Sequence, residues 1–546
     1  MKEMSVFKWM YVNCGRRIKE GAVLVALNAW SAVCVTIFAL LSQKVMDSAQ
    51  GGDKNALIKN SIYLLCLIIS QILARVIASL VEAKSQGKAE INLRTNVFSS
   101  IIRGDYADSV ERHSGDLMTR LTADVQVVSD QYVHIVPTTV AFVVRILSGA
   151  IALYQIDKNF ALIFILCGLL IVVVAVLSRK RLKKLHRRVQ EKDSKVRSFM
   201  QEMLENLFAI KVFGIEEKII KISSKQQNKF YREKVKKKTF SIMAGIGFSL
   251  AFAVGYLAAV AYGSYGVLNG TMTFGAVVAI VQLVNQLQSP IVGITSILPS
   301  FFAMTASAQR LMEICDDGKK HAEDVDVEYD DFVRVKVRNA VFGYGDEKVI
   351  SGASFTVNKG EFIGIKGPSG SGKTTVLKLI TGLYPVDEGN VIIETKDTEY
   401  DCKHTRKLFS FVPQGNMLFS GTIRENLTIL NPDASEEDIK EALNLAAADF
   451  AYDLDGGLDF VLGEAGVGIS EGQAQRIAIA RALLGSGGIM LMDESTSALD
   501  ADTERLVIDN LKKNKGLTVL MITHREAVLD RCDRLISVEN GRIEEI

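Results

Sequence analysis

The chain has 546 residues, of which 48% are hydrophobic, and its formal net charge at pH 7 is +2. This length exceeds that of one domain, and a mean hydropathy of +0.20 is too high for an ordinary soluble enzyme. Basic clusters adjoin the ends of apolar stretches, where the positive-inside rule predicts them, which disfavours nucleic acid as a partner and favours a lipid bilayer. The seven cysteines show neither a disulfide framework nor metal-ligand spacing.

Apolar windows long enough to cross a bilayer, roughly 20 residues, occur about six times before residue 310. They begin near Gly21, Ser61, Tyr132, Phe160, Ser241 and Phe274. The first window lacks charge and follows Arg16, Arg17 and Lys19, so the N-terminus is predicted to lie in the cytosol. Two long polar segments, 81–131 and 178–240, have helical apolar periodicity, which predicts that the spans continue into the cytosol as helices.

Several polar side chains interrupt the apolar windows. The ionisable ones are Arg75, His134 and Arg145, and the amides in the last window are Gln282, Asn285, Gln286 and Gln288. An ionisable group inside a membrane is costly, and such groups are hypothesised to contact substrate. The alternative is hydrogen bonding between neighbouring helices.

An acidic stretch after the last window predicts a linker over 319–327, between a membrane domain (1–318) and a second domain (328–546). The alternation over 333–338 is typical of a half-buried strand. Further strands are predicted at 361–366, 408–412, 488–492 and 518–522, interleaved with helices. The predicted fold class is a polytopic α-helical membrane domain followed by an α/β domain.

The second domain contains Gly367-Pro-Ser-Gly-Ser-Gly-Lys373-Thr374-Thr375 between an apolar run and a helix-like segment, the context of a P-loop. In such a loop, backbone N–H groups surround nucleotide phosphates, the lysine supplies a fixed cation, and the following hydroxyl binds magnesium. We therefore expect ATP and Mg²⁺ as ligands. The residues expected to bind them here are Gly367, Ser369, Gly370, Ser371, Gly372, Lys373, Thr374 and Thr375.

Further motifs follow in a fixed order: Ile469-Ser-Glu-Gly-Gln473, Ile489-Met-Leu-Met-Asp493-Glu494, Ser497-Ala-Leu-Asp500 and His524. With them the chain resembles the ABC transporter superfamily, as an exporter-type half-transporter with six spans and one ATP-binding domain. Gln414, in Phe411-Val-Pro-Gln, matches the family's Q-loop, and Tyr344 matches the aromatic residue that stacks on adenine. The resemblance covers nearly the whole chain.

The resemblance implies a role for each motif residue. Glu494 is the expected general base, and His524 is expected to contact the γ-phosphate. Lys373 is expected to act in catalysis by binding the phosphates. Thr374, Gln414 and Asp493 are expected to hold Mg²⁺. The nucleotide contacts also include Ser470, Gly472, Gln473 and Asp500, since the signature motif binds ATP held by a second subunit.

A partner subunit is therefore expected: a homodimer is favoured, because Glu494, His524 and the core of the signature motif are all present, and a heterodimer is the alternative. Ile469 and Glu471 stand where the common signature has Leu and Gly. Short transverse helices that dock on the ATPase domain are expected near Tyr106–Ser114 and Glu205–Phe213, with solvated helix surface as the alternative reading.

The implied function is ATP-driven export of a peptide, lipid-like or drug-like amphipath by alternating access, in a bacterial cytoplasmic membrane. The alternatives are an importer of exporter-like architecture, a soluble-type ABC ATPase and an ATP-gated channel. The motifs do not encode the direction of transport.

Overall fold

The computed structural model describes residues 5–112, 114–317, 325, 327–345, 347–415, 417–463, 466–485, 487–514 and 516–546. The chain divides into two compact units: Met1–Ile102 with Ser114–Asp316, and Arg103–His113 with Asp317–Ile546. The domain division predicted from the sequence stays a prediction. Of the predicted linker 319–327, only Val325 and Val327 fall among the described residues.

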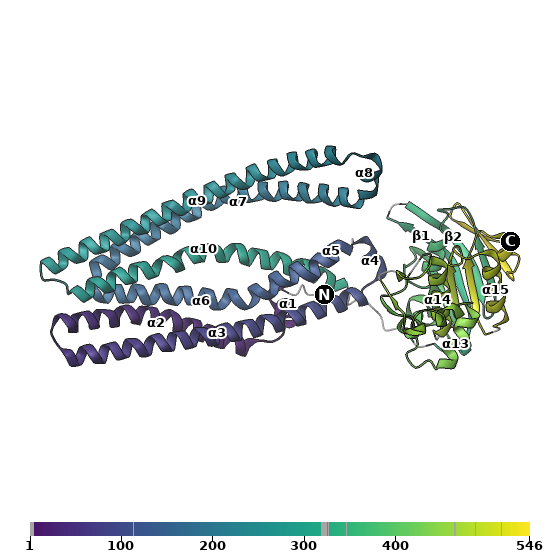
Figure 1. Cartoon of the computed structure of the whole chain (residues 1–546), viewed down its shortest axis with the longest axis horizontal. Helices are drawn as coiled ribbons and strands as arrows, with labels where there is room; N and C mark the ends of the chain where they lie inside the picture. Colours follow the sequence, from purple (N-terminus) through teal and green to yellow (C-terminus); the bar gives the residue numbers. More distant parts are fainter. Residues whose placement is uncertain are drawn as a thin grey trace. The chain divides into compact units, whose positions relative to one another are not determined.

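The first unit is helical (Figure 1). Its elements are α1 (Val6–Asn13), α2 (Ile18–Gln50), α3 (Lys54–Arg103), α5 (Ser114–Thr119), the π-helix η1 (Arg120–Asp124), α6 (Val125–Ile156), α7 (Lys158–Glu205), α8 (Leu207–Phe213), α9 (Glu216–Leu268) and α10 (Phe274–Asp317). The helices α3, α7, α9 and α10 have 50, 48, 53 and 44 residues. At about 1.5 Å per residue they exceed the roughly 30 Å hydrocarbon core of a bilayer, which confirms the predicted helical extensions.

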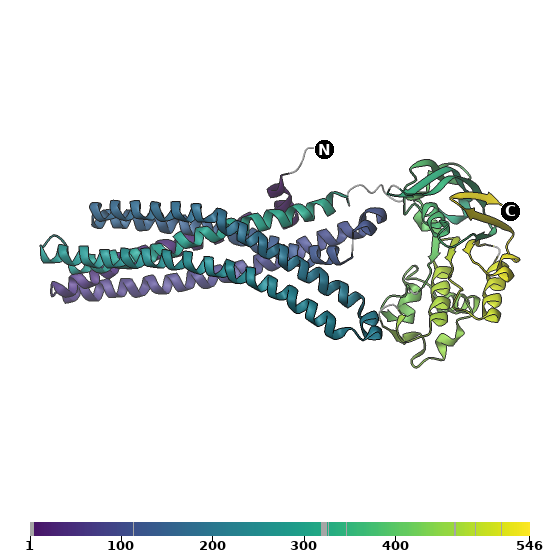
Figure 2. The same ribbon diagram turned by 90° about the horizontal axis from the view of Figure 1, so that it is seen from above.

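Within the part of the chain that the structure describes, four helices are long and apolar enough to cross a membrane: Ile18–Gln50, Lys54–Arg103, Gly115–Ile156 and Glu216–Leu268. The windows predicted from Phe160 and Phe274 fall in α7 and α10. The number of long helices therefore agrees with the predicted six. Helices α7 and α9 run side by side over much of their length and are joined by α8, as Figure 1 and Figure 2 both show.

An ion pair with a buried carboxylate lies at the π-helix of the first unit. Asp124, the last residue of η1, accepts hydrogen bonds from Arg310 Nε (2.8 Å) and from Ser307 Oγ (2.9 Å), both in α10. Asp124 and Ser307 are buried. This network fixes the beginning of α6 against the last turns of α10. No local pattern predicts this network, because the partners are 183 and 186 residues apart.

The second unit is built on two sheets. An antiparallel sheet has the order β2-β1-β4-β5 and comprises β1 (Phe332–Tyr344), β2 (Glu347–Asn358), β4 (Glu388–Thr395) and β5 (Glu399–Asp401). The larger sheet has the order β12-β11-β3-β10-β9-β6 and comprises β3 (Phe362–Lys366), β6 (Phe409–Val412), β9 (Ile489–Asp493), β10 (Thr518–Ile522), β11 (Arg534–Glu539) and β12 (Arg542–Glu545). Its strands pair in parallel except β11 with β12. A short pair, β7 (Gly421–Thr422) and β8 (Val461–Leu462), is separate.

The helices of this unit are α4 (Tyr106–Glu111), α11 (Lys373–Ile380), α12 (Ile423–Thr428), α13 (Glu436–Leu445), α14 (Glu471–Leu484), α15 (Ala501–Lys513) and α16 (Glu526–Leu529). They cover both faces of the larger sheet, because β9 is buried on both sides. Ile489 and Leu491 pack into one apolar cluster, and Met490 and Met492 pack into the other. The four strands predicted after residue 360 are confirmed, each to within one residue at either end.

The short helix α4 groups with this unit although it precedes α5 in the chain. The ring of Tyr106 meets that of Tyr384 edge-on, with centroids 5.6 Å apart, and Ala107 packs against the apolar cluster of β3 and α11. The predicted docking of a transverse helix near Tyr106–Ser114 is therefore seen for α4. The second predicted transverse helix is α8 (Leu207–Phe213), in the first unit.

Candidate functional site

The P-loop connects β3 to α11 and curls around the ammonium group of Lys373. The Nζ atom donates hydrogen bonds to the carbonyls of Gly367 (2.9 Å) and Pro368 (2.8 Å), and Lys373 is buried. Gly367 has a positive φ of 153°, and a side chain there would strike the carbonyl oxygen of Val538. Glycine is required for this close backbone approach.

The loop also contains a polar atom that points to a ligand. Ser371 Oγ is buried and has no hydrogen-bond partner among the described residues. Buried polar atoms are normally paired, so an unpaired hydroxyl in the loop that also holds the Lys373 ammonium fits an anion such as a phosphate oxygen. Ser369, Gly370 and Gly372 complete the turn before the helix that Lys373 opens. The residues present therefore fit the phosphates of ATP.

A second group of side chains gathers where three parallel strands end. Gln414 follows β6, Glu494 follows β9 and His524 follows β10. Gln414 Nε2 donates to Glu494 Oε2 at 2.9 Å, and His524 Nε2 lies 3.3 Å from Glu494 Oε1. In open α/β sheets the carboxyl ends of the strands form the ligand site. The structure thus brings together three residues that the sequence had placed at separate motifs.

The backbone of Glu494 is held in an unusual conformation. Its φ is +47°, in the left-handed region that non-glycine residues rarely adopt. Its N–H donates to the carbonyl of Ile522 in β10 at 3.1 Å. Strained residues of this kind gather at functional sites, where the surrounding structure compensates for them.

Asp493 precedes Glu494 and is buried at the end of β9. Burial raises the pKa of its carboxyl, and the neighbouring Glu494 charge raises this pKa further, against a hydrogen bond from Thr374 and the Lys378 and Lys373 charges. A hydroxyl, a carboxylate and, from Gln414, an amide oxygen are the hard ligands that Mg²⁺ prefers. In the described residues no three His, Cys, Asp or Glu side chains form a metal site. Magnesium would therefore need phosphate oxygens as additional ligands.

Tyr344 ends β1 beside the P-loop helix. Its hydroxyl lies 3.3 Å from Thr375 Oγ1, and its ring contacts that of Tyr384 edge-on with centroids 5.5 Å apart. The ring is partly exposed, at 44%. An exposed aromatic face next to a phosphate loop fits the stacking role that the sequence assigned to it.

The signature residues begin α14. Ser470 caps the helix: its Oγ accepts from the N–H of Gln473 (3.3 Å), and Gln473 Oε1 accepts from the N–H of Ser470 (2.9 Å). A Cβ at Gly472 would lie 2.9 Å from the carbonyl oxygen of Ala498, so glycine permits close packing on the next motif. In the structure as described, no hydrogen bond or ion pair joins these residues to Lys373 or Glu494. They present a helix N-terminus of their own.

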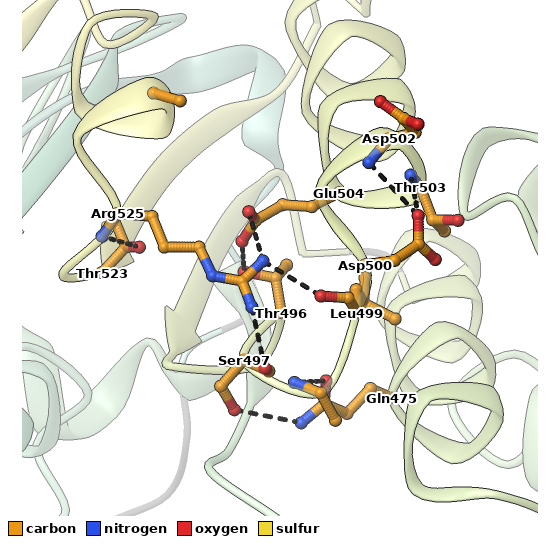
Figure 3. A network of polar contacts seen from close by, with 12 residues as sticks. Gln475, Thr496, Ser497, Leu499, Asp500, Asp502, Thr503, Glu504, Thr523 and Arg525 are labelled. Atoms are coloured by element: carbon orange, nitrogen blue, oxygen red, sulfur yellow. Dashed lines mark hydrogen bonds and ion pairs between the residues drawn. The ribbon is translucent and has the colours of Figure 1, made fainter.

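Asp500 caps α15 in the same manner. Its Oδ1 accepts from the N–H groups of Thr503 (3.0 Å) and Asp502 (3.2 Å), and these hydrogen bonds, that of Thr503 first, lower the pKa of its carboxyl. Figure 3 shows this cap next to a network that sequence reasoning missed, centred on Arg525, Glu504 and Gln475. The only local signal was an arginine directly after His524.

Comparison with known proteins agrees with this geometry. Residues 22–291 match the family model of the ABC transporter transmembrane region, and residues 350–497 match the ABC transporter model. A Bacillus subtilis relative, the uncharacterized ABC transporter ATP-binding protein YknU, is 30% identical over 84% of this chain and 80% of its own length. The chain belongs to the ABC transporter family. It is an exporter-type half-transporter, with a multi-pass membrane domain and an ATPase domain that hydrolyses ATP to drive transport.

Other similarities cover most of this half-transporter. The ATP-dependent lipid A-core flippase of Escherichia coli is 27% identical over 96% of this chain and 92% of its own length. The solved structure of a bacterial Atm1-family ABC exporter with ATP bound has a TM-score of 0.82 at 23% identity, over 97% of this chain and 95% of that one, which shows the shared fold. The chain spans about half (51%) of the length of ABC transporter B family member 1 of *Dictyostelium discoideum*, at 28% identity.

Proposed function

We propose that this half-transporter exports an amphipathic substrate that carries an anionic group, as a homodimer that uses Mg²⁺ and ATP in a bacterial cytoplasmic membrane. The observation that carries the proposal is the meeting of Gln414, Glu494 and His524 beside the P-loop, in a chain that also has long apolar helices. Peptide, lipid-like and drug-like amphipaths all fit this class.

The chemical roles follow from the positions of the side chains. Lys373 and the loop N–H groups bind the phosphates. Thr374, Gln414 and Asp493 would hold Mg²⁺, which would supply neutralising charge for the phosphates. Glu494 accepts the proton of the attacking water, and Gln414 and His524 hold its carboxylate in place through contacts of 2.9 and 3.3 Å. His524 is also available to contact the γ-phosphate.

A second copy completes each ATP site. Ser470, Gly472 and Gln473 share no hydrogen bond or ion pair with Lys373 or Glu494 in the residues that the structure describes, so they are available to ATP on another subunit. Half-transporters of this type generally work as dimers. Because this chain has Glu494, His524 and the signature serine together, two copies of it would form two complete sites.

The substrate class rests on two arginines in the membrane domain. In the described residues neither Arg75 nor Arg145 forms an ion pair with a carboxylate. Arg145 Nε is buried and has no hydrogen-bond partner among the described residues. An unneutralised pair of charges inside a membrane protein is costly. An anionic group on the substrate would neutralise it.

The other polar residues of the spans divide into two groups. His134 Nδ1 lies 2.9 Å from Glu82 Oε1, which favours hydrogen bonding between α6 and α3 over substrate contact. The Oε1 atoms of Gln282 and Gln286 are buried without a partner among the described residues, which favours contact with a substrate donor. Asn285 is exposed in the single chain. A relative is named a lipid A-core flippase, which supports a lipid-like substrate.

Proteoliposomes test this proposal. ATP added outside reaches only molecules whose ATPase domain faces outward, so export moves a labelled lipid from the outer leaflet to the inner one, where dithionite cannot reduce the label. Both lipids carry the label on the same acyl chain and differ only in the head group. We expect the protected fraction of labelled phosphatidylglycerol to rise with ATP and to exceed that of the labelled choline lipid.

Arg145→Ala should remove the preference for the anionic lipid, while Glu494→Gln should stop transport of both. A fall in the protected fraction would indicate import. Equal transport of both lipids by the wild type would contradict the anionic substrate class.

A further inference from the structure

Arg525, which follows His524 in the sequence, forms hydrogen bonds to the turn between the Glu494 motif and α15. These contacts of Arg525 with the turn and with Glu504 are called the clasp. Arg525 Nη1 donates to the carbonyl of Leu499 (3.0 Å) and to Glu504 Oε2 (2.6 Å), and Nη2 donates to the carbonyl of Ser497 (3.0 Å). Figure 3 shows the guanidinium between these acceptors. One side chain therefore binds two carbonyls, those of Ser497 and Leu499, in the 497–500 turn, which consists of Ser497, Ala498, Leu499 and Asp500.

The clasp is anchored by a buried carboxylate. The Glu504 side chain is only 4% exposed, and its other oxygen accepts a hydrogen bond from Thr496 Oγ1 at 2.6 Å. A buried carboxylate needs such partners, and removal of one partner from a buried pair is strongly destabilising. Thr496 lies two residues after Glu494. The network thus reaches from α15 back to the strand end that carries the proposed base.

A third side chain ties the same turn to the signature helix. Gln475, buried in α14, accepts from the N–H of Ala498 at 3.2 Å, and its Nε2 lies 3.5 Å from Ser497 Oγ. Gly472 packs closely on the carbonyl of Ala498 from the same helix. Contacts therefore run without interruption from α14 through the turn to Arg525 and its neighbour His524.

We propose that Arg525 is a positioning residue for ATP hydrolysis: it locks the 497–500 turn and, through the shared backbone, sets His524 against Glu494. The proposal rests on the roles proposed above for Glu494 and His524. Because Ser470 begins the helix that Gln475 belongs to, the clasp also connects the residues facing a chain's own ATP to those facing the ATP of the second copy.

A purely structural ion pair and a positioning clasp can be separated by a double variant. Arg525→Met leaves Glu504 buried and charged without its partner, so it lowers both the melting temperature and turnover. Arg525→Met combined with Glu504→Gln removes both charges and keeps an acceptor for Thr496, so the melting temperature should recover. The carbonyls of Ser497 and Leu499 remain without their donor in both variants.

The experiment measures melting temperature, kcat and KM for ATP on the full chain in lipid. We expect the double variant to regain wild-type stability while kcat stays on the order of tenfold lower, the scale of hydrogen bonds to a charged group, with KM within about twofold. Arg525→Lys should pair with Glu504 and restore stability, yet restore kcat only in part, because an ammonium lacks the fork that spans both carbonyls.

A matched control is Arg534→Met. Arg534 also bonds a glutamate (Glu361, 3.0 Å) and a backbone carbonyl (Thr356, 3.3 Å), but it lies in β11, and none of its hydrogen bonds among the described residues reaches His524. It should lose stability and keep its kcat. A double variant at Arg525 and Glu504 with wild-type kcat would overturn the clasp. Glu494→Gln in the same assay separates the two proposals, since turnover by that variant would instead refute the role of Glu494.

Discussion

Replacement of Glu494 by glutamine changes one atom of the proposed base and leaves its contacts in place. A glutamine amide has the shape of the carboxylate, so it can still accept from Gln414 Nε2, 2.9 Å away, and its amide nitrogen can take the place of the oxygen that lies 3.3 Å from His524 Nε2. The left-handed backbone at this position suits glutamine no worse than glutamate. We therefore expect the Glu494→Gln variant to fold and to bind ATP.

We expect the Glu494→Gln variant to lose hydrolysis rate and to keep its folding and its ATP binding. A positioned general base contributes about 10²- to 10⁴-fold to rate, which corresponds to about 2.7–5.5 kcal/mol in the activation free energy. The removed carboxylate is the only one within reach of both Gln414 and His524 among the described residues. Its substitution should lower kcat by that factor, while affinity for ATP stays equal or increases because a negative charge near the phosphates is gone.

Steady-state ATPase assays and equilibrium ATP binding on the same reconstituted preparation give the two quantities. Glu526→Gln is the matched control, because it removes an exposed carboxylate two residues after His524 and should keep wild-type turnover. If Glu494→Gln turns over ATP within about threefold of the wild type, the carboxylate contributes far less than a general base does, and the reasoning from this geometry is wrong.

Three further substitutions test other parts of the site. The pKa of Asp493 is raised in the folded protein, so ionisation of this carboxyl lowers the stability once the pH rises above the ordinary aspartate pKa, and the cost persists at neutral pH. The nucleotide-free Asp493→Asn variant should therefore melt at pH 7 no lower than the wild type, but it should lose the stabilisation that Mg²⁺ with ATP provides. A lower melting temperature of the nucleotide-free variant would contradict this. Gly472→Ala places a Cβ 2.9 Å from the Ala498 carbonyl oxygen, and this overpacking should lower the free energy of unfolding by about 1–3 kcal/mol. The melting temperature and kcat should fall together. An unchanged kcat would show that hydrolysis does not need the packing of α14 on the 497–500 turn. Tyr344→Ala removes the exposed ring, and because base stacking is worth about 1–3 kcal/mol, KM for ATP should rise about tenfold with little change in kcat; an unaltered KM would exclude stacking.

What the sequence predicted well is encoded locally. The P-loop is a nine-residue segment whose glycines and lysine specify their own conformation, and the buried strands after residue 360 are short apolar runs with clear ends. The long helices were predictable for the same reason, since roughly 20 apolar residues suffice to indicate a span.

What the sequence did not predict depends on tertiary pairing. Arg525 and Glu504 are 21 residues apart, and nothing local marks a glutamate in the polar-looking helix α15 as buried. Asp124 and Arg310 are 186 residues apart in the sequence. The sequence also could not predict that Arg145 Nε lacks a hydrogen-bond partner among the described residues, because this depends on which side chains the neighbouring helices bring close to it.

The most direct test of the central claim is ATP turnover by this chain purified alone and reconstituted in lipid. Two copies should form two complete sites, so we predict Mg²⁺-dependent hydrolysis that disappears in Glu494→Gln. Folded protein that binds ATP but does not hydrolyse it would contradict the homodimer and show that a different subunit must supply the missing half of each site.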